Sequence, residues 1–95
     1  MRFDWDPIKA AANIKNHEGV TFEEAKTVFG DPLSAVFMDE DHSFDEKREI
    51  IIGYSQGQRL LVVCFTEREE DVIRIITARR ADADERRKHE NESHR

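Results

Sequence analysis

The amino-acid sequence predicts an α+β domain in which helices pack against one antiparallel sheet. Apolar residues recur at helical spacing through the first third of the chain and with a period of two from residue 33 onward. No Pro-, Gly- or Ser-rich linker interrupts the short segments. The predicted order is β-α-α-β-β-β-β-α, with two N-terminal helices on one side of the sheet. We assign residues 1–90 to a single domain and residues 91–95 to a frayed tail.

A short strand and a capped helix open the chain. Residues 2–5 alternate polar and apolar side chains, as a half-buried strand does. Asp6 is a favoured N-cap, and Pro7 fits the first helical position, where its missing N–H has no helical partner. We therefore expect a helix over residues 7–17 that stops before Gly19.

The second helix is predicted by a capping box. The Thr21 hydroxyl is expected to accept a bond from the N–H three residues later, while Glu24 reaches back to the cap. Val20 and Ala25 have the spacing of a hydrophobic staple. The helix is expected over residues 22–29, because Gly30 and the following Asp-Pro pair favour a turn.

Four strands and a last helix follow. The strands are predicted at residues 34–38, 48–54, 59–66 and 71–78, joined by an acidic loop at 39–46, a hairpin turn at 55–58 and a turn at 67–70. Both faces are apolar along residues 60–65 and 72–76, which indicates central strands covered on both sides. Asp82 and Glu85 have capping-box spacing, so a charged helix is expected from about residue 83 to 90.

Composition narrows the functional class. The single cysteine, Cys64, excludes a disulfide framework and a thiolate zinc site, and its apolar surroundings predict an inert buried thiol. The chain has no apolar run long enough for a membrane span and no apolar signal region, so we expect a cytoplasmic protein with no membrane contact. The net charge is −6, with 6 Lys and Arg against 12 Asp and Glu in residues 1–50 and 9 of each in residues 51–95. A protein that coats nucleic acid non-specifically is disfavoured, but a local basic cluster is not.

The strongest chemical feature is the arginine-rich end of the last strand. Strand alternation assigns Arg74 and Arg80 to one face and Arg79, with Thr77, to the other. Because the pair ends a strand, we expect Arg79 and Arg80 to stay exposed on a common concave surface. The planar guanidinium binds phosphate through two charge-assisted hydrogen bonds. The alternative is that these arginines only solvate the end of a strand.

Histidine supplies the candidate acid–base groups, because its side chain titrates near neutral pH. The four are His17, His42, His89 and His94. His17 fits a helix cap, and His42 lies in the acidic loop. His89 lies on the last helix and can face the arginines only if that helix packs beside them.

No metal or cofactor site is predicted. The histidines do not have the spacing of metal ligands. Residues 39–50 resemble a calcium loop only superficially, because Phe44 and Ile50 occupy the positions of its essential Gly and Glu. The four glycines are isolated and form no phosphate-binding loop.

An ordered set of motifs along nearly the whole chain resembles the BrnT family of ribonuclease toxins of type II toxin–antitoxin systems, which is related in fold to RelE. The set is Phe3-Asp4-Trp5-Asp6-Pro7, Lys9-Ala10-Ala11, His17, Gly19 to Ala25, Asp31-Pro32-Leu33, Asp41-His42-Ser43, Arg48, Ile52-Gly53, Leu61-Val62-Val63, Thr66-Glu67-Arg68, Arg74 to Ala81 and Glu85-Arg86-Arg87. The chain differs from the usual pattern in one additional residue, Glu18, in His89 where an aromatic residue is common, and in its acidic net charge.

The resemblance implies a metal-independent endoribonuclease that cleaves messenger RNA and inhibits translation. It also implies an antitoxin that is encoded beside the toxin gene and binds DNA. The toxin would contact operator DNA only through this antitoxin. The implied catalytic residues are Arg68, Arg79 and Arg80, with Glu67 or His89 as the base and His42 as the third candidate for it. The implied substrate-binding residues are Arg48, Arg74 and His42. In this mechanism the RNA's own 2′-hydroxyl attacks the phosphorus, so no cofactor is needed.

Two other functions are compatible with the same residues. A non-catalytic binding module would use the C-terminal arginines to bind an acidic partner. A small DNA-binding regulator is disfavoured, because no helix-turn-helix pattern is present and only the last helix is basic.

Overall fold

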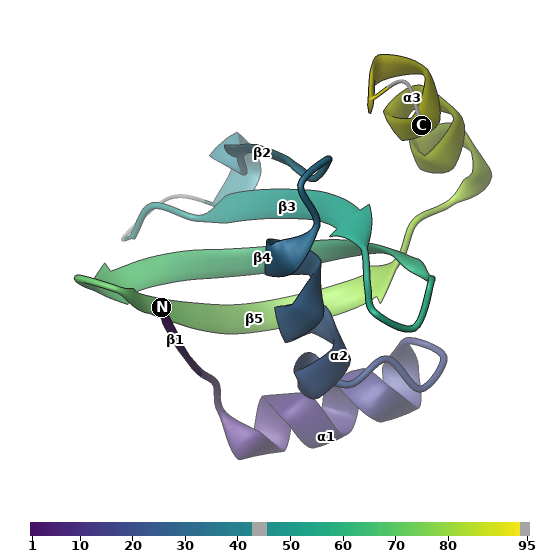
Figure 1. Ribbon diagram of the computed structural model, residues 1–95. Helices are drawn as coiled ribbons and strands as arrows, with labels where there is room; N and C mark the ends of the chain where they lie inside the picture. The colour runs from purple at the N-terminus through teal and green to yellow at the C-terminus, as the bar shows by residue number, and fades with distance from the viewer. Residues whose placement is uncertain (43–45, 94–95) are drawn as a thin grey trace.

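The computed structural model describes residues 1–42 and 46–93 and confirms the α+β class and the predicted order of elements (Figure 1). The elements are β1 (Arg2–Asp4), α1 (Pro7–Asn16), α2 (Phe22–Thr27), η1 (Val28–Gly30), β2 (Ala35–Met38), η2 (Glu40–His42), β3 (Glu49–Tyr54), β4 (Leu60–Glu69), β5 (Val72–Arg80) and α3 (Ala83–Ser93), where η marks a short 3-10 turn. No helix within the described residues is long and apolar enough to cross a membrane.

The five strands form one sheet in the order β1-β5-β4-β3-β2. Strands β2 to β5 make an antiparallel meander, as the hairpin signals predict. β1 instead runs parallel to β5, with Arg2 opposite Val72. No tight hairpin links β1 to β5, because two helices and three strands lie between them in the sequence. The connection therefore does not force the two strands to pair antiparallel.

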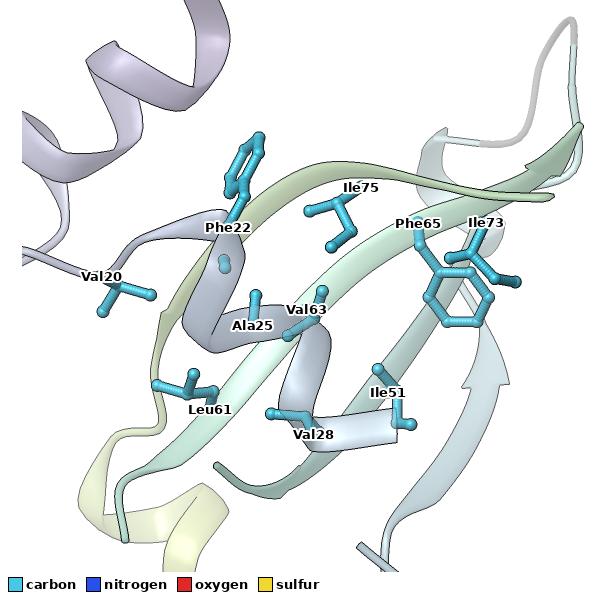
Figure 2. Close-up of a cluster of buried hydrophobic side chains, with 11 residues drawn as sticks. Val20, Phe22, Ala25, Val28, Ile51, Leu61, Val63, Phe65, Ile73 and Ile75 are labelled. Atoms are coloured by element: carbon cyan, nitrogen blue, oxygen red, sulfur yellow. The ribbon is translucent and has the colours of Figure 1, made fainter. Parts of the chain in front are cut away.

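Helices α1 and α2 cover one face of the sheet, and the main core lies between them and the strands (Figures 1 and 2). The core is made of buried apolar residues: Val20, Phe22, Ala25, Val28, Ile51, Leu61, Val63, Phe65, Ile73, Ile75 and Ala78. Phe29 stacks edge-on between Phe3 and Phe65, with ring centroids 5.1 and 5.0 Å away, and so ties β1 to β4. A smaller cluster around Ile52, Leu60 and Val62 lies on the opposite face, which we call the open face.

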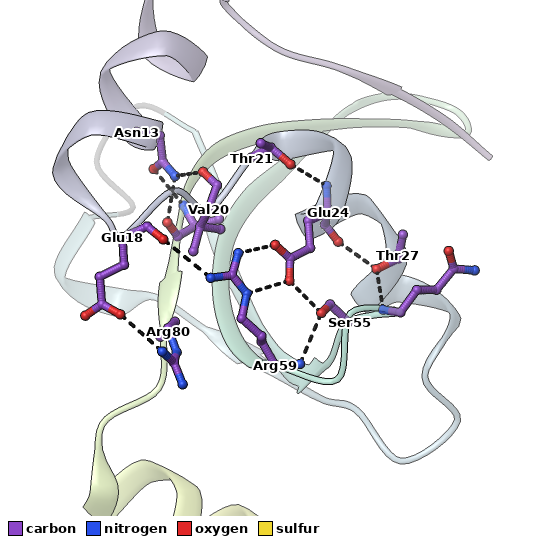
Figure 3. A network of polar contacts seen from close by, with 11 residues as sticks. Asn13, Glu18, Val20, Thr21, Glu24, Thr27, Ser55, Arg59 and Arg80 are labelled. Atoms are coloured by element: carbon purple, nitrogen blue, oxygen red, sulfur yellow. Dashed lines mark hydrogen bonds and ion pairs between the residues drawn. The ribbon is translucent and has the colours of Figure 1, made fainter.

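The predicted caps form, with one exception. Asp6 accepts the Ile8 N–H at 2.9 Å, and the Thr21 hydroxyl accepts the Glu24 N–H at 2.9 Å. The carboxylate of Glu24 does not reach back to the cap. It binds Arg59 and Ser55 of the β3–β4 hairpin, because an arginine is a stronger partner for a carboxylate than a backbone amide (Figure 3).

The last hairpin is longer than predicted. β4 continues to Glu69, so the turn expected at residues 67–70 is wrong, and the chain reverses at Glu70 and Asp71, where Asp71 has φ of 68°. The charged residues at 67–69 have no apolar period, and such a sequence predicts a turn. Their backbone groups pair with β5 all the same, since a sheet ladder does not require apolar side chains.

A buried amide joins α1 to the outer side of β5. β1 pairs only with residues 72–74, so no strand within the described residues lies beside the edge of β5 beyond them. Asn13 accepts the Ala78 N–H at 3.1 Å and donates to the carbonyls of Ala78 at 2.8 Å and Val20 at 2.9 Å (Figure 3). One side chain therefore satisfies three backbone groups in the core.

We predict that Asn13→Ala lowers the free energy of unfolding by about 3 kcal/mol, because it leaves buried backbone groups of Ala78 and Val20 unsatisfied. Urea denaturation measures the change. Asn16→Ala, at an exposed position of the same helix, is the matched control and is expected to stay within about 0.5 kcal/mol of the parent. Equal stability of the two variants contradicts the prediction.

Candidate functional site

Two adjoining hollows lie on the open face, and Val62 forms part of both. The first hollow, of about 350 Å³, runs between the sheet and α3 and is lined by Ala35, Phe37, Ile52, Val62, Glu85, Lys88, His89 and Glu92. The second, of about 240 Å³, is lined by Asp39, Arg48, Ile50, Val62, Cys64, Ile76, Thr77 and Arg79. Together they make a groove with an apolar floor and a charged rim, which is the form that ligand sites usually take.

A bulge in β5 decides which arginines face this groove. Cys64 pairs with Thr77, but the next residue of β4 pairs with Ile75, so Ile76 is an extra residue in β5. Beyond the bulge the alternation of side chains is inverted. Arg74, Thr77 and Arg79 share the open face, whereas Arg80 projects to the helix-covered face.

The expected common surface for Arg79 and Arg80 is therefore wrong. Arg80 forms an ion pair with Glu18 at 3.3 Å, on the side of the sheet where α1 and α2 lie (Figure 3). Glu18 has φ of 54°, and its carbonyl accepts a bond from Arg59 at 3.4 Å. Glu18 thus joins the α1–α2 loop to the end of β5, on the face of the sheet opposite the groove.

Arg79 is held in place by the first turn of α3. Its two terminal nitrogens donate to the two carboxylate oxygens of Glu85, each at 2.8 Å. Glu85 also accepts the Asp82 N–H at 2.9 Å, while Asp82 accepts the Glu85 N–H at 2.8 Å, so the predicted capping box is complete. Hydrogen bonding to Arg79 lowers the pKa of Glu85, and the same bonds raise the pKa of Arg79.

A third hollow, lined mainly by basic residues, continues the groove toward the β1 edge. It is lined by Lys9, Arg48, Arg68, Arg74, Ile75, Ile76 and the acidic residues Asp6 and Glu46. Glu46 lies 3.5 Å from Arg68 and 4.0 Å from Arg48, and Arg74 pairs with Asp4 at 3.3 Å. Arg48 lines both this hollow and the one beside Arg79, so the structure brings Arg48, Arg68, Arg74 and Arg79 into one continuous region.

The remaining predicted residues lie in different places. Glu67 is exposed and pairs with Ile73, whose side chain belongs to the main core, so Glu67 is on the helix-covered side. His42 ends the η2 turn, and His94 lies outside the described residues. His17 is the C-cap residue that follows α1, and its backbone N–H donates to the Asn13 carbonyl.

Among the predicted histidines whose side chains the structure describes, His17 and His89, only His89 lines the groove. It is 4% exposed, lies one helical turn beyond Glu85, and lines the first hollow. Its ring lies 6.4 Å from that of Tyr54, whose hydroxyl donates to Glu90 at 2.9 Å and accepts from Arg86 at 3.5 Å. These contacts fix α3 against the end of β3.

Sequence reasoning missed Tyr54, Lys88 and Lys9 as site residues. The sequence predicts only that Tyr54 ends a strand, and no spacing links it to the last helix. Lys88 follows Glu85 by three residues and so shares its helical face, which is a usable signal. Lys9 reaches the region only through the tertiary position of α1.

Within residues 1–42 and 46–93, no group of three or more His, Cys, Asp or Glu is placed to hold a metal ion. Cys64 is half-buried in the groove floor, with its sulfur 3.8 Å from a carboxylate oxygen of Asp39. Burial, aided by the negative charge of Asp39 and opposed by Arg48, raises the pKa of the Cys64 thiol to about 11.

Comparisons with known proteins converge on one family. Residues 5–85 match the sequence profile described as "Ribonuclease toxin, BrnT, of type II toxin-antitoxin system". The fold is similar to the crystal structure of the Brucella abortus ribonuclease toxin BrnT, with a TM-score of 0.66, 24% sequence identity, and coverage of 86% of this chain and 97% of that one. No curated protein matches the sequence.

We predict that Cys64 of the native chain reacts slowly with iodoacetamide at pH 8, because only the thiolate reacts and a thiol with a pKa of about 11 is almost wholly protonated there. The rate is expected to rise as the pH approaches 11, and Asp39→Asn is expected to lower the pKa. The guanidinium-unfolded chain is the control, with roughly 100-fold more thiolate at pH 8. Equal alkylation rates for native and unfolded chains at pH 8 contradict this.

Proposed function

The chain belongs to the BrnT family of ribonuclease toxins of type II toxin–antitoxin systems, and from this membership we propose that it cleaves messenger RNA on its open face and thereby inhibits translation. The observation that carries the proposal is the bidentate contact of Arg79 with the Glu85 carboxylate. This contact lies at the rim of a groove along which further arginines are placed.

We propose that Arg79 binds the scissile phosphate. Phosphate and carboxylate oxygens accept the same paired bonds from a guanidinium, and Glu85 already occupies that geometry at 2.8 Å. A bound phosphodiester would take one or both of these bonds. Glu85 also accepts a hydrogen bond from the Asp82 N–H. Its carboxylate therefore keeps one partner when Arg79 binds the phosphate instead. Arg79 would then stabilise the negative charge that develops on the phosphate oxygens.

The neighbouring basic residues are suited to the rest of the RNA backbone. Arg48, Arg68, Arg74 and Lys9 line the third, basic hollow. The three arginines each have an acidic neighbour that a phosphate would replace. The chain therefore combines an acidic total charge with a local anion-binding region. Contact of several of these basic residues with phosphates predicts binding that weakens as salt is added.

The 2′-hydroxyl of the RNA is the proposed nucleophile, and His89 the proposed base. The 2′-oxygen forms a bond to phosphorus, its proton passes to His89, and the bond from phosphorus to the 5′-oxygen breaks. The products are a 2′,3′-cyclic phosphate and a 5′-hydroxyl, whose proton comes from water. His89 lies on the same helical face as Glu85 and lines the groove, whereas Glu67 lies on the other side of the sheet and has no part in this mechanism.

An antitoxin partner follows from the family, because a type II toxin is neutralised by a protein. We propose that this antitoxin is encoded beside the toxin, that it binds operator DNA, and that the toxin contacts DNA only through it. We also propose that the chain acts in the cytoplasm, where its substrate is.

The two arginines at the end of β5 give a matched test. Arg79→Ala is expected to lower the rate of RNA cleavage about 10²–10³-fold, because it removes a positioned donor to the transition state. Arg80→Ala also removes an exposed arginine and an ion pair, but on the opposite face, and is expected to keep nearly the parent rate. Cleavage of a labelled messenger RNA by purified chains measures both.

Thermal midpoints close to the parent value confirm that both variants fold. Equal loss of activity in the two variants overturns the assignment of Arg79. If the parent cleaves no RNA while Arg79→Ala weakens binding of the antitoxin, the alternative of a non-catalytic binding module is correct.

Attack by the 2′-hydroxyl predicts cleavage that does not depend on metal. Activity is expected to persist in excess chelator, and mass spectrometry of the products is expected to show a 2′,3′-cyclic phosphate or its hydrolysis product. A substrate with 2′-deoxyribose at the cleaved position is the control and is expected to stay intact. Loss of activity in chelator with recovery on addition of magnesium contradicts the mechanism.

A further inference from the structure

The edge strand β2 presents an apolar surface that nothing within the described residues covers. Its side chains are exposed on both faces: Val36 is 52% exposed, Phe37 51% and Met38 45%. Leu33, just before the strand, is also exposed. Consecutive exposed apolar residues on an unpaired edge are avoided in monomeric proteins, because the edge is a template for another strand.

The backbone of β2 is also placed for pairing. The Asp39 N–H donates to the Arg48 carbonyl at 2.9 Å, so these two residues form a hydrogen-bonded pair of the β2–β3 ladder. Hydrogen-bonded and non-bonded pairs alternate in an antiparallel ladder. Phe37 therefore bonds to β3, whereas Val36 and Met38 direct their N–H and carbonyl groups away from the sheet.

Charge decides what can occupy this edge. Asp31 precedes the strand, and Asp39, Glu40 and Asp41 follow it. A second copy of the chain, pairing antiparallel with β2, would bring the acidic end of each strand beside the acidic start of the other. Like charges facing each other across strands are destabilising. An apolar segment flanked by Lys or Arg is complementary to both the strand and its ends.

We propose that the antitoxin adds a strand to the β2 edge, through a segment that alternates apolar residues and is flanked by basic ones. This inference rests on the proposed function, because it takes the antitoxin as the partner. Phe37 and Ala35 line the first hollow opposite Glu85 and His89. A strand added beside β2 would extend the sheet along this wall of the groove, so binding there also hinders the access of RNA.

The experiment measures the affinity of the purified antitoxin, the product of the gene beside the toxin gene, for the full chain by calorimetry. Val36→Pro removes one outward N–H and no bond to β3, and proline is tolerated at such edge positions. We expect the dissociation constant to rise at least about tenfold. Val36→Lys, which keeps the backbone, is expected to weaken binding as well, because it replaces an apolar side chain that would contact the apolar segment and adds a positive charge close to its basic flanks.

The matched control is Ile8→Lys, at an 80% exposed apolar position of α1, which is expected to bind like the parent. RNA cleavage and thermal midpoints near the parent values confirm that the β2 variants fold. Parent-like affinity of Val36→Pro and Val36→Lys overturns this inference and leaves the proposed function standing. Failure of the parent chain to bind the antitoxin overturns both. Self-association of the parent that the Val36 variants abolish identifies a second copy as the occupant and also overturns the inference.

Discussion

The pairing of Asn13 with Ala78 is the contact on which the arrangement of the molecule depends. It gives β5 a partner where β1 ends, anchors α1 to the sheet, and holds the carbonyl of Val20 at the start of the second helical segment. It also keeps Ala78 in the main core just after the bulge at Ile76. The residue that follows must then project to the open face, which is how a buried amide on α1 sets the direction of Arg79.

Most of the fold could be predicted from the sequence because its signals are local. Asp6, Thr21 and Asp82 cap helices within three residues of themselves, and the hairpin turns lie between strands of clear period two. The face of the sheet to which each arginine projects could not be predicted. Side chains alternate between the two faces along a regular strand, and one bulged residue reverses this alternation for the residues beyond it. Whether a strand carries a bulge depends on its neighbours, and the sequence of β5 alone does not contain that information.

The site shows the same division between local and distant causes. The sequence predicts the arginines as candidates because a guanidinium binds anions in any context, and Arg48, Arg68, Arg74 and Arg79 do share a region. Which carboxylates pair with the arginines could not be predicted from the sequence. Glu24 and Glu85 have the same capping-box spacing, yet Arg59 recruits the first away from its cap, while the second serves its cap and Arg79 together. Only the tertiary fold distinguishes the two carboxylates.

The attachment of α3 has a consequence for how binding and motion are connected. This helix is polar on nearly all sides, and its contacts with the body of the protein include those of Glu85 with Arg79, of Glu90 and Arg86 with Tyr54, and of His89 with the groove. An anion that takes Arg79 from Glu85 removes one of these attachments and so favours release of the helix. By thermodynamic linkage, any event that lifts α3 must strengthen the affinity of Arg79 for anions by the same factor. Glu85 of α3 and a phosphate ligand therefore compete for the Arg79 guanidinium. Binding of an anion by Arg79 is thus coupled to local opening of the C-terminal helix.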